Sequence, residues 1–138
     1  MTAPAPVTTT PAVATLQKFM DFFRAGDLAG ACGLIAPEAV WHEADSLQWS
    51  GEWHGPDGFA AMITAICTPT ELLLEDATIS DASDIVVLRL NAVFVSRISG
   101  RRLPMRIVEH YTIKDGWIYG ADVYYKDSAA VNHLVDNG

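Results

Sequence analysis

The spacing of apolar residues changes once along the chain, near Pro69, and predicts helices before that point and strands after it. Helical spacing indicates helices over 13–24, from Asp27 to about 35, and over 56–66. Residues 39–44 read as a strand, followed by a loop over 45–54 that is dense in Trp, Ser and Gly. After Pro69, alternating patterns predict strands near 72–79, 85–97, 101–114 and 117–125.

Two turn signals connect the later strands. Ser99-Gly100 and Asp115-Gly116 each lie between strand patterns, so we expect consecutive hairpins and a mostly antiparallel sheet. Helices followed by such a sheet give an α+β fold in which the helices cover one sheet face. Residues 1 to about 11 are Thr, Ala and Pro without periodicity, which predicts a disordered lead-in. A single domain over 12–138 should follow it.

Composition narrows the class of partner. The net charge of −8 argues against binding nucleic acid or an anionic membrane surface, because both need a concentrated basic patch. No apolar stretch reaches the length of a transmembrane helix, and the first residues lack the pattern of a signal peptide. Cys32 and Cys67 have no second ligand at metal-binding spacing, so we interpret them as free thiols in a reducing cytoplasm.

The hairpin over 106–125 carries the first chemical hypothesis. If Asp115-Gly116 is a two-residue loop, Glu109 lies directly opposite Asp122 on a largely apolar face. If the loop has three residues and a bulge, His110 joins the face of Asp122 instead, because a shift of one residue turns a strand over. The first register is favoured, since the other face then collects polar residues, namely Arg106, His110, Thr112 and Lys114.

Two acids in an apolar site would support acid-base chemistry. Burial and a neighbouring carboxylate both disfavour ionisation, so one of Glu109 and Asp122 would stay protonated near neutral pH. Tyr111 either donates a hydrogen bond to an oxyanion or packs in the core. His42 either points inward as a general base or is exposed. A metal site from His42, Glu43 and His54 is not expected, because adjacent strand residues point to opposite faces.

Three stretches resemble a known family. They are Trp41-His42-Glu43 with the segment 50–58, Glu109-His110-Tyr111 with Asp115-Gly116, and the closing segment 124–130. Together with the order of elements over 13–135, they resemble the SnoaL-like branch of the nuclear transport factor 2-like superfamily. The resemblance implies a cone-shaped sheet wrapped around three N-terminal helices, with an apolar pocket between the concave sheet face and the helices.

The resemblance also implies a range of functions. Family members include polyketide cyclases, ketosteroid isomerases, dehydratases, epoxide hydrolases and binding modules without chemistry, and the fold does not choose among them. Epoxide hydrolysis is disfavoured, because Arg89 lacks a neighbouring Asp. Asp122 matches the Asp that the enzymes place on the last long strand. We therefore expect a cofactor-independent and metal-independent isomerase, cyclase or hydratase acting on a small apolar carbonyl or polyketide-like compound. The alternative is a non-catalytic small-molecule-binding domain.

Aromatic residues complete the expectations. The candidate ligand contacts are Trp41, Trp53, Tyr111, Phe23 and Met20. Trp49 and Trp53 would form either a lid over the ligand or the closure of the core. A stripe of Trp117, Tyr119, Val123 and Tyr125 is predicted on the outer sheet face, where a homodimer would cover it.

Overall fold

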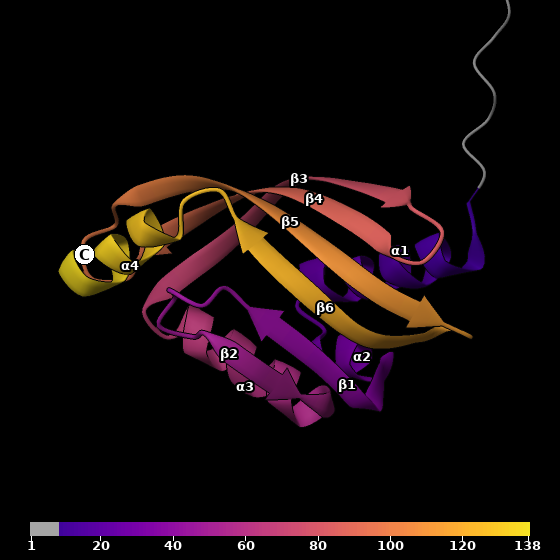
Figure 1. Cartoon of the computed structure of the whole chain (residues 1–138). Helices are drawn as coiled ribbons and strands as arrows, with labels where there is room; N and C mark the ends of the chain where they lie inside the picture. Colours follow the sequence, from indigo (N-terminus) through magenta and orange to yellow (C-terminus); the bar gives the residue numbers. More distant parts are fainter. Residues whose placement is uncertain (1–8) are drawn as a thin grey trace, which may run out of the picture.

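The computed structural model describes residues 9–138, and these form four helices and six strands (Figure 1). The predicted disordered lead-in falls largely on residues 1–8, which lie outside the described residues. In chain order the elements are α1 (Pro11–Arg24), α2 (Leu28–Cys32), β1 (Ile35–Glu43), β2 (Gly51–His54), α3 (Gly55–Cys67), β3 (Thr70–Asp81), β4 (Val86–Ser96), β5 (Arg102–Lys114), β6 (Trp117–Tyr125) and α4 (Ser128–Asn137). No helix within residues 9–138 is long and apolar enough to cross a membrane.

The first helix begins with a side-chain cap. The Thr10 hydroxyl accepts a hydrogen bond from the Val13 backbone N–H at 3.2 Å, and Pro11 occupies the first turn, where no backbone donor is needed. Gly26 follows the helix with φ of 75°, a conformation that glycine adopts without strain. The helix turns its apolar stripe, which includes Leu16, Phe19 and Met20, toward the sheet.

The strands form one curved sheet in the order β2-β1-β6-β5-β4-β3. All neighbours are antiparallel except β1 and β6, which run parallel. Figure 1 shows the sheet bending over α1 and α3, which lie against its concave face. The predicted α+β cone with helices ahead of a mostly antiparallel sheet is confirmed.

The parallel contact of β1 and β6 depends on a glycine. Gly120 is the residue opposite Val40, and a Cβ atom placed there would lie 2.8 Å from the Val40 carbonyl oxygen. Such a contact is too close for any other side chain without a shift of the backbone. Gly120 therefore lets β1 pack against the middle of the sheet and carry its side chains over the concave face.

Two elements were not predicted from the sequence. β2 lies within the segment expected to be a loop, and it pairs with β1 at the sheet edge. α4 follows β6 and is capped by Asp127, whose carboxylate accepts a hydrogen bond from Ala130 N–H at 3.1 Å. The Gln48 backbone N–H donates to Asn132 of α4 at 3.1 Å, so this helix and the 44–50 segment hold each other over one end of the sheet.

The hairpin of β5 and β6 differs from the predicted register. Asp115 and Gly116 have φ of 52° and 81°, as a two-residue type I′ loop requires, and Lys114 faces Trp117 as expected. One step further, Ile113 pairs with Ile118 but Thr112 pairs with Gly120, which leaves Tyr119 as an extra residue in a bulge.

Because of the bulge, the β6 side chains that follow it point to the opposite sheet face from the one predicted. Glu109 faces Val123, and Asp122 faces His110. The expected pairing of Glu109 with Asp122 is therefore wrong. The outer-face stripe is wrong in part, because Val123 is buried and Tyr125 also points inward, while Tyr124 is 54% exposed on the outer face.

Candidate functional site: two glutamates in an apolar pocket

The concave sheet face presents its side chains in rows across β1, β6 and β5. Ala121 pairs with both Trp41 and Tyr111, so a small residue lies between two large aromatic ones. The next inward position on β6 is Val123, which pairs with Glu109 on one side and lies level with Glu43 on the other. Neighbouring strands are about 4.8 Å apart, so the Cα atoms of Glu43 and Glu109 are roughly 10 Å apart.

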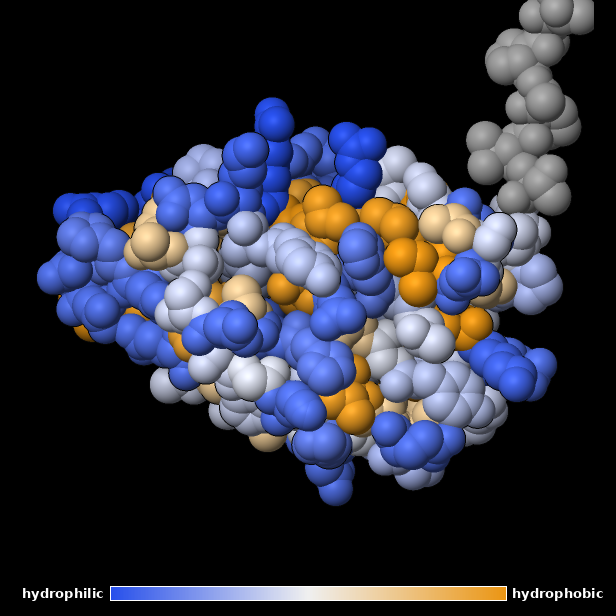
Figure 2. All heavy atoms as spheres, in the orientation of Figure 1, coloured by the Kyte–Doolittle hydropathy of each residue, from blue (hydrophilic) through white to orange (hydrophobic). Residues whose placement is uncertain are grey.

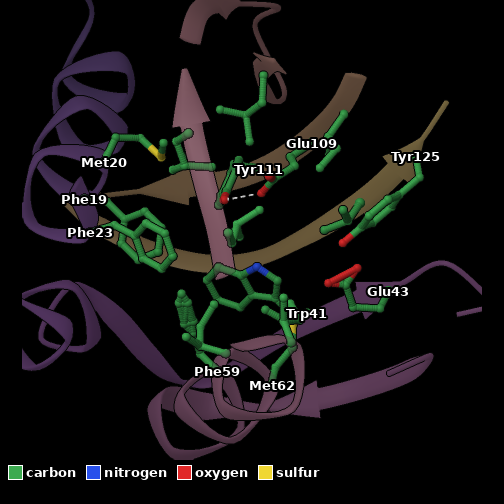
Figure 3. A pocket seen from close by; sticks show the side chains of 17 residues that line it. Phe19, Met20, Phe23, Trp41, Glu43, Phe59, Met62, Glu109, Tyr111 and Tyr125 are labelled. Atoms are coloured by element: carbon green, nitrogen blue, oxygen red, sulfur yellow. Dashed lines mark hydrogen bonds between the residues drawn. The ribbon is translucent and has the colours of Figure 1, made fainter. Parts of the chain in front are cut away.

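These rows form the floor of a cavity of about 60 Å³ between the sheet and the helices. Figure 3 shows the side chains that surround it. Most of the wall is apolar or aromatic, and consists of Phe19, Met20, Phe23, Trp41, Phe59, Met62, Ile63, Ile66, Leu72, Leu74, Leu90, Ile107 and Val123. The polar members are Glu43, Glu109, Tyr111 and Tyr125.

Glu109 is the carboxyl group with a partner. The Tyr111 hydroxyl donates a hydrogen bond to Glu109 Oε1 at 2.5 Å, drawn as the dashed line in Figure 3. Loss of solvent raises the pKa of Glu109 to about 7, although the Tyr111 hydrogen bond acts in the opposite direction by stabilising the ionised form. Glu109 is therefore divided between its two protonation states near neutral pH.

Glu43 is also buried, and one of its oxygens lacks a hydrogen-bond partner among the described residues. Its side chain is only 6% exposed, and its Oε1 atom is buried without a hydrogen bond. Burial and, to a smaller extent, the nearby negative charge of Glu109 together raise the pKa of Glu43 to about 8. At pH 7 Glu43 is mainly protonated, so the pocket holds a carboxylic acid that can donate a proton and a carboxylate that can accept one.

Aromatic rings hold these acids in an apolar setting. The Trp41 ring stacks on Phe59 with centroids 4.8 Å apart, and meets Tyr111 edge-on at 5.9 Å. Phe19 packs near all three, with its centroid 5.4 Å from that of Phe59. This packing fixes the ring of Tyr111, and with it the hydroxyl that orients Glu109.

A second aromatic group lies beside the pocket and reaches it through Tyr125. The Trp53 indole N–H donates to the Trp49 carbonyl at 3.1 Å, and the Trp49 indole N–H donates to the Tyr125 hydroxyl at 3.3 Å. Trp49 is 3% exposed and stacks near Phe94, so it closes the core instead of lying over a ligand. Trp53 is half-buried and does not line the cavity.

The structure divides the predicted site residues into two groups. Those that line the cavity are Glu109, Tyr111, Trp41, Phe23 and Met20. Asp122 and His42 pair with each other across β6 and β1, but both are exposed on the outer sheet face. The inward-facing position predicted for Asp122 is therefore wrong, and of the two alternatives for His42 the structure shows the exposed one.

Glu43 was not predicted from the sequence as an acid of the pocket. A signal for it was present, because side chains of a strand alternate between faces and Trp41 is a natural core residue. A buried Trp41 places Glu43 on the same face and His42 on the opposite one, which is what the burial of the three residues shows. His42 and Glu43 therefore point to opposite sheet faces and cannot bind one metal ion together.

Solved structures share this architecture. A nuclear transport factor 2-like protein of unknown function from Burkholderia pseudomallei superposes with a TM-score of 0.81 at 20% identity, covering 91% of this chain and 98% of its own. TerC co-crystallised with polyporic acid gives a TM-score of 0.82 at 17% identity, covering 93% and 100% of the two chains. A protein provisionally assigned as a polyketide cyclase from Xanthomonas campestris gives 0.78 at 15% identity, covering 92% and 98%. At these identities the likeness concerns the fold.

The sequence itself matches a family model. No protein in the curated set matches the chain. The model of the SnoaL-like domain, however, matches residues 16–121, which contain most of α1, all of β1 to β5 and the first part of β6. The protein belongs to the SnoaL-like family.

Proposed function

We propose that this protein is an acid-base enzyme of the isomerase, cyclase or hydratase type, acting on a small apolar carbonyl compound without a cofactor. The observation that carries the proposal is the pair of inward-facing glutamates, Glu43 and Glu109, with pKa values raised toward neutrality in an otherwise apolar cavity. Acids and bases are most effective when their pKa lies near the working pH. TerC, which shares this fold, was co-crystallised with polyporic acid, and this supports the binding of a small molecule.

The two carboxyl groups have different parts in the proposed reaction. The Glu109 carboxylate removes a proton from the carbon next to the carbonyl group, and the electron pair of that C–H bond moves into a new C=C bond. The protonated Glu43 gives its proton to the carbonyl oxygen, so the product of this step is a neutral enol. Return of the proton from Glu109 to another carbon, while the enol O–H gives its proton back to Glu43, restores the carbonyl group and completes an isomerisation. Alternatively, the enol carbon attacks an electrophile to close a ring, and the O–H proton again returns to Glu43.

The small cavity sets a condition on substrate entry. About 60 Å³ is less than a ring-shaped ligand requires, so side chains of the wall must move when one binds. Met20 and Met62 are suited to this, because methionine is unbranched and changes rotamer easily. We therefore expect the bound form to differ from the structure mainly at these two side chains.

Turnover of a panel of ketones and unsaturated ketones tests the proposal. Glu109→Gln should lower kcat about a hundredfold to ten-thousandfold, which is the usual contribution of a general base, while ligand binding changes little. Asp122→Asn is the matched control, because it also removes one acid from the same hairpin but on the exposed face. Equal activity of Glu109→Gln and wild type, or loss of activity in Asp122→Asn alone, would contradict the assignment.

The second candidate is a non-catalytic binding domain of the same fold. The largely apolar cavity favours it, because such a site retains a ligand without requiring any reaction. Ligands that raise the melting temperature but remain unchanged after prolonged incubation with wild type would support this candidate over the enzyme.

We further propose that the protein works in the cytoplasm as a homodimer through the outer sheet face. Tyr124 and Trp117 are 54% and 44% exposed, which leaves aromatic surface that a second copy would cover. The free thiols of Cys32 and Cys67 fit a reducing compartment. Sedimentation should give a dimer for wild type and a monomer for Tyr124→Asp, and a monomeric wild type at high micromolar concentration would contradict the dimer.

A further inference from the structure

The ionisable side chains of the pocket wall are all acidic, so the wall can carry negative charge only. The side chains that α1, α3, β3 and β4 contribute are all apolar. Among the described residues, the titratable groups that face the cavity are therefore Glu43 from β1, Glu109 and Tyr111 from β5, and Tyr125 from β6. Within residues 9–138 the wall contains no Lys, Arg or His, so no positive side chain there balances a negative ligand.

We propose that this pocket binds hydrophobic amines in their protonated form, with the ammonium group between Glu109 and Glu43 and the hydrocarbon part among the aromatic rings. The inference rests on the same pocket as the proposed function, but it concerns a second class of ligand. Such an amine need not be converted.

The unpartnered oxygen of Glu43 is the first argument. Oε1 of Glu43 is a buried acceptor without a donor, and the nearby Glu109 carboxyl has a hydrogen bond from the protein at one oxygen only. A ketone can accept the proton of Glu43, but it brings no donor for the free oxygen of Glu109, and a carboxylate would place a third acid beside these two. An ammonium group has up to three N–H donors, so it can donate hydrogen bonds to Glu43 and Glu109 at the same time.

The aromatic wall is the second argument. Cations are attracted to the faces of Trp, Tyr and Phe, and more strongly when water is excluded. The ring centroids of Trp41, Phe19 and Phe59 lie within 6.1 Å of one another, and all three rings line the cavity with the two acids. The apolar remainder of the amine would pack against the same rings.

The charge of the whole molecule acts in the same direction. A net charge of −8 attracts cations to the surface and repels anions. An ammonium beside the two acids also favours their ionised forms, so binding near neutral pH should release protons to the buffer. Because the ammonium occupies the proposed base, amines should compete with carbonyl substrates.

Three probes of nearly equal size separate the possible ligand charges. Benzylamine, benzyl alcohol and benzoate are titrated into the full chain by isothermal calorimetry at pH 7.5, in two buffers of different ionisation enthalpy. We expect benzylamine to bind at least tenfold more tightly than benzyl alcohol, with proton release, and benzoate to bind most weakly. Benzyl alcohol or benzoate binding as tightly as benzylamine would overturn the proposal.

Variants assign the site. Glu109→Gln should weaken benzylamine at least tenfold and leave benzyl alcohol unchanged, whereas Glu52→Gln, on the exposed edge strand β2, should change neither. If Glu109→Gln does not fold by circular dichroism, Glu43→Gln makes the same test. Unchanged benzylamine affinity in a folded pocket variant would overturn the proposal. Ketone turnover by wild type is measured separately, so loss of the amine proposal leaves the proposed reaction standing, and the reverse also holds.

Discussion

Replacing Glu43 with Gln should change how the stability of the protein depends on pH. Folding moves the Glu43 carboxyl group into an apolar wall and raises its pKa from 4.5 to about 8. Between these values the folded state keeps a proton that the unfolded chain has lost. The free energy of unfolding therefore falls as pH rises through this window.

The size of the effect follows from the shift. One group contributes a slope of about 1.4 kcal/mol per pH unit, so the full shift of Glu43 corresponds to roughly 4 to 5 kcal/mol between pH 4.5 and 8. Gln keeps the shape of the side chain but cannot ionise. Its buried amide costs about 1–3 kcal/mol at every pH, so the test concerns the slope and not the absolute stability.

Urea unfolding at intervals between pH 5.5 and 9 measures that slope. Glu43→Gln should be less stable than wild type at the acidic end and should gain on it steadily as pH rises. Glu52→Gln, an exposed acid on the neighbouring strand, should follow wild type in parallel. Parallel curves for wild type and Glu43→Gln would refute the buried, protonated state of Glu43.

Two further substitutions test the supporting structure. Tyr111→Phe should raise the pKa of Glu109, because the lost hydroxyl stabilises the ionised form, and an NMR titration that shows a fall instead would contradict the role of Tyr111. Gly120→Ala should destabilise the protein by about 1–3 kcal/mol in urea, because its Cβ atom would meet the Val40 carbonyl oxygen at 2.8 Å, and unchanged stability would contradict the close approach of β1 and β6.

The order of elements was predictable because apolar spacing reports it directly. The positive φ values of Asp115 and Gly116 confirm the two-residue loop. What the sequence did not reveal was the bulge at Tyr119 just beyond it, because an extra residue in a strand leaves the alternating pattern on either side intact. The bulge alone moved Asp122 from the inner face to the outer one.

The second acid of the site was hidden for a different reason. Glu43 comes from β1, which reaches the middle of the sheet by pairing in parallel with β6, far along the chain. Local patterns carry no information on such a pairing. The sequence therefore favoured Asp122, on the strand next to Glu109 in the hairpin, as the second acid in place of Glu43. α4 was missed because its ten residues follow a short polar segment and carry a weak apolar stripe, with Val131 and Leu134 as its buried residues.

The most direct test of the account is the titration of the glutamate carboxyl groups by ¹³C NMR in the wild-type protein, with Glu43→Gln and Glu109→Gln used to assign the signals. We expect two glutamates to titrate far above the ordinary value of 4.5, Glu109 with a pKa of about 7 and Glu43 with a pKa of about 8. Glu109→Gln should lower the pKa of Glu43, because a neighbouring negative charge is lost. Titration of both groups near 4.5 would contradict the account, since the pocket would then hold two ordinary carboxylates and no proton donor at neutral pH.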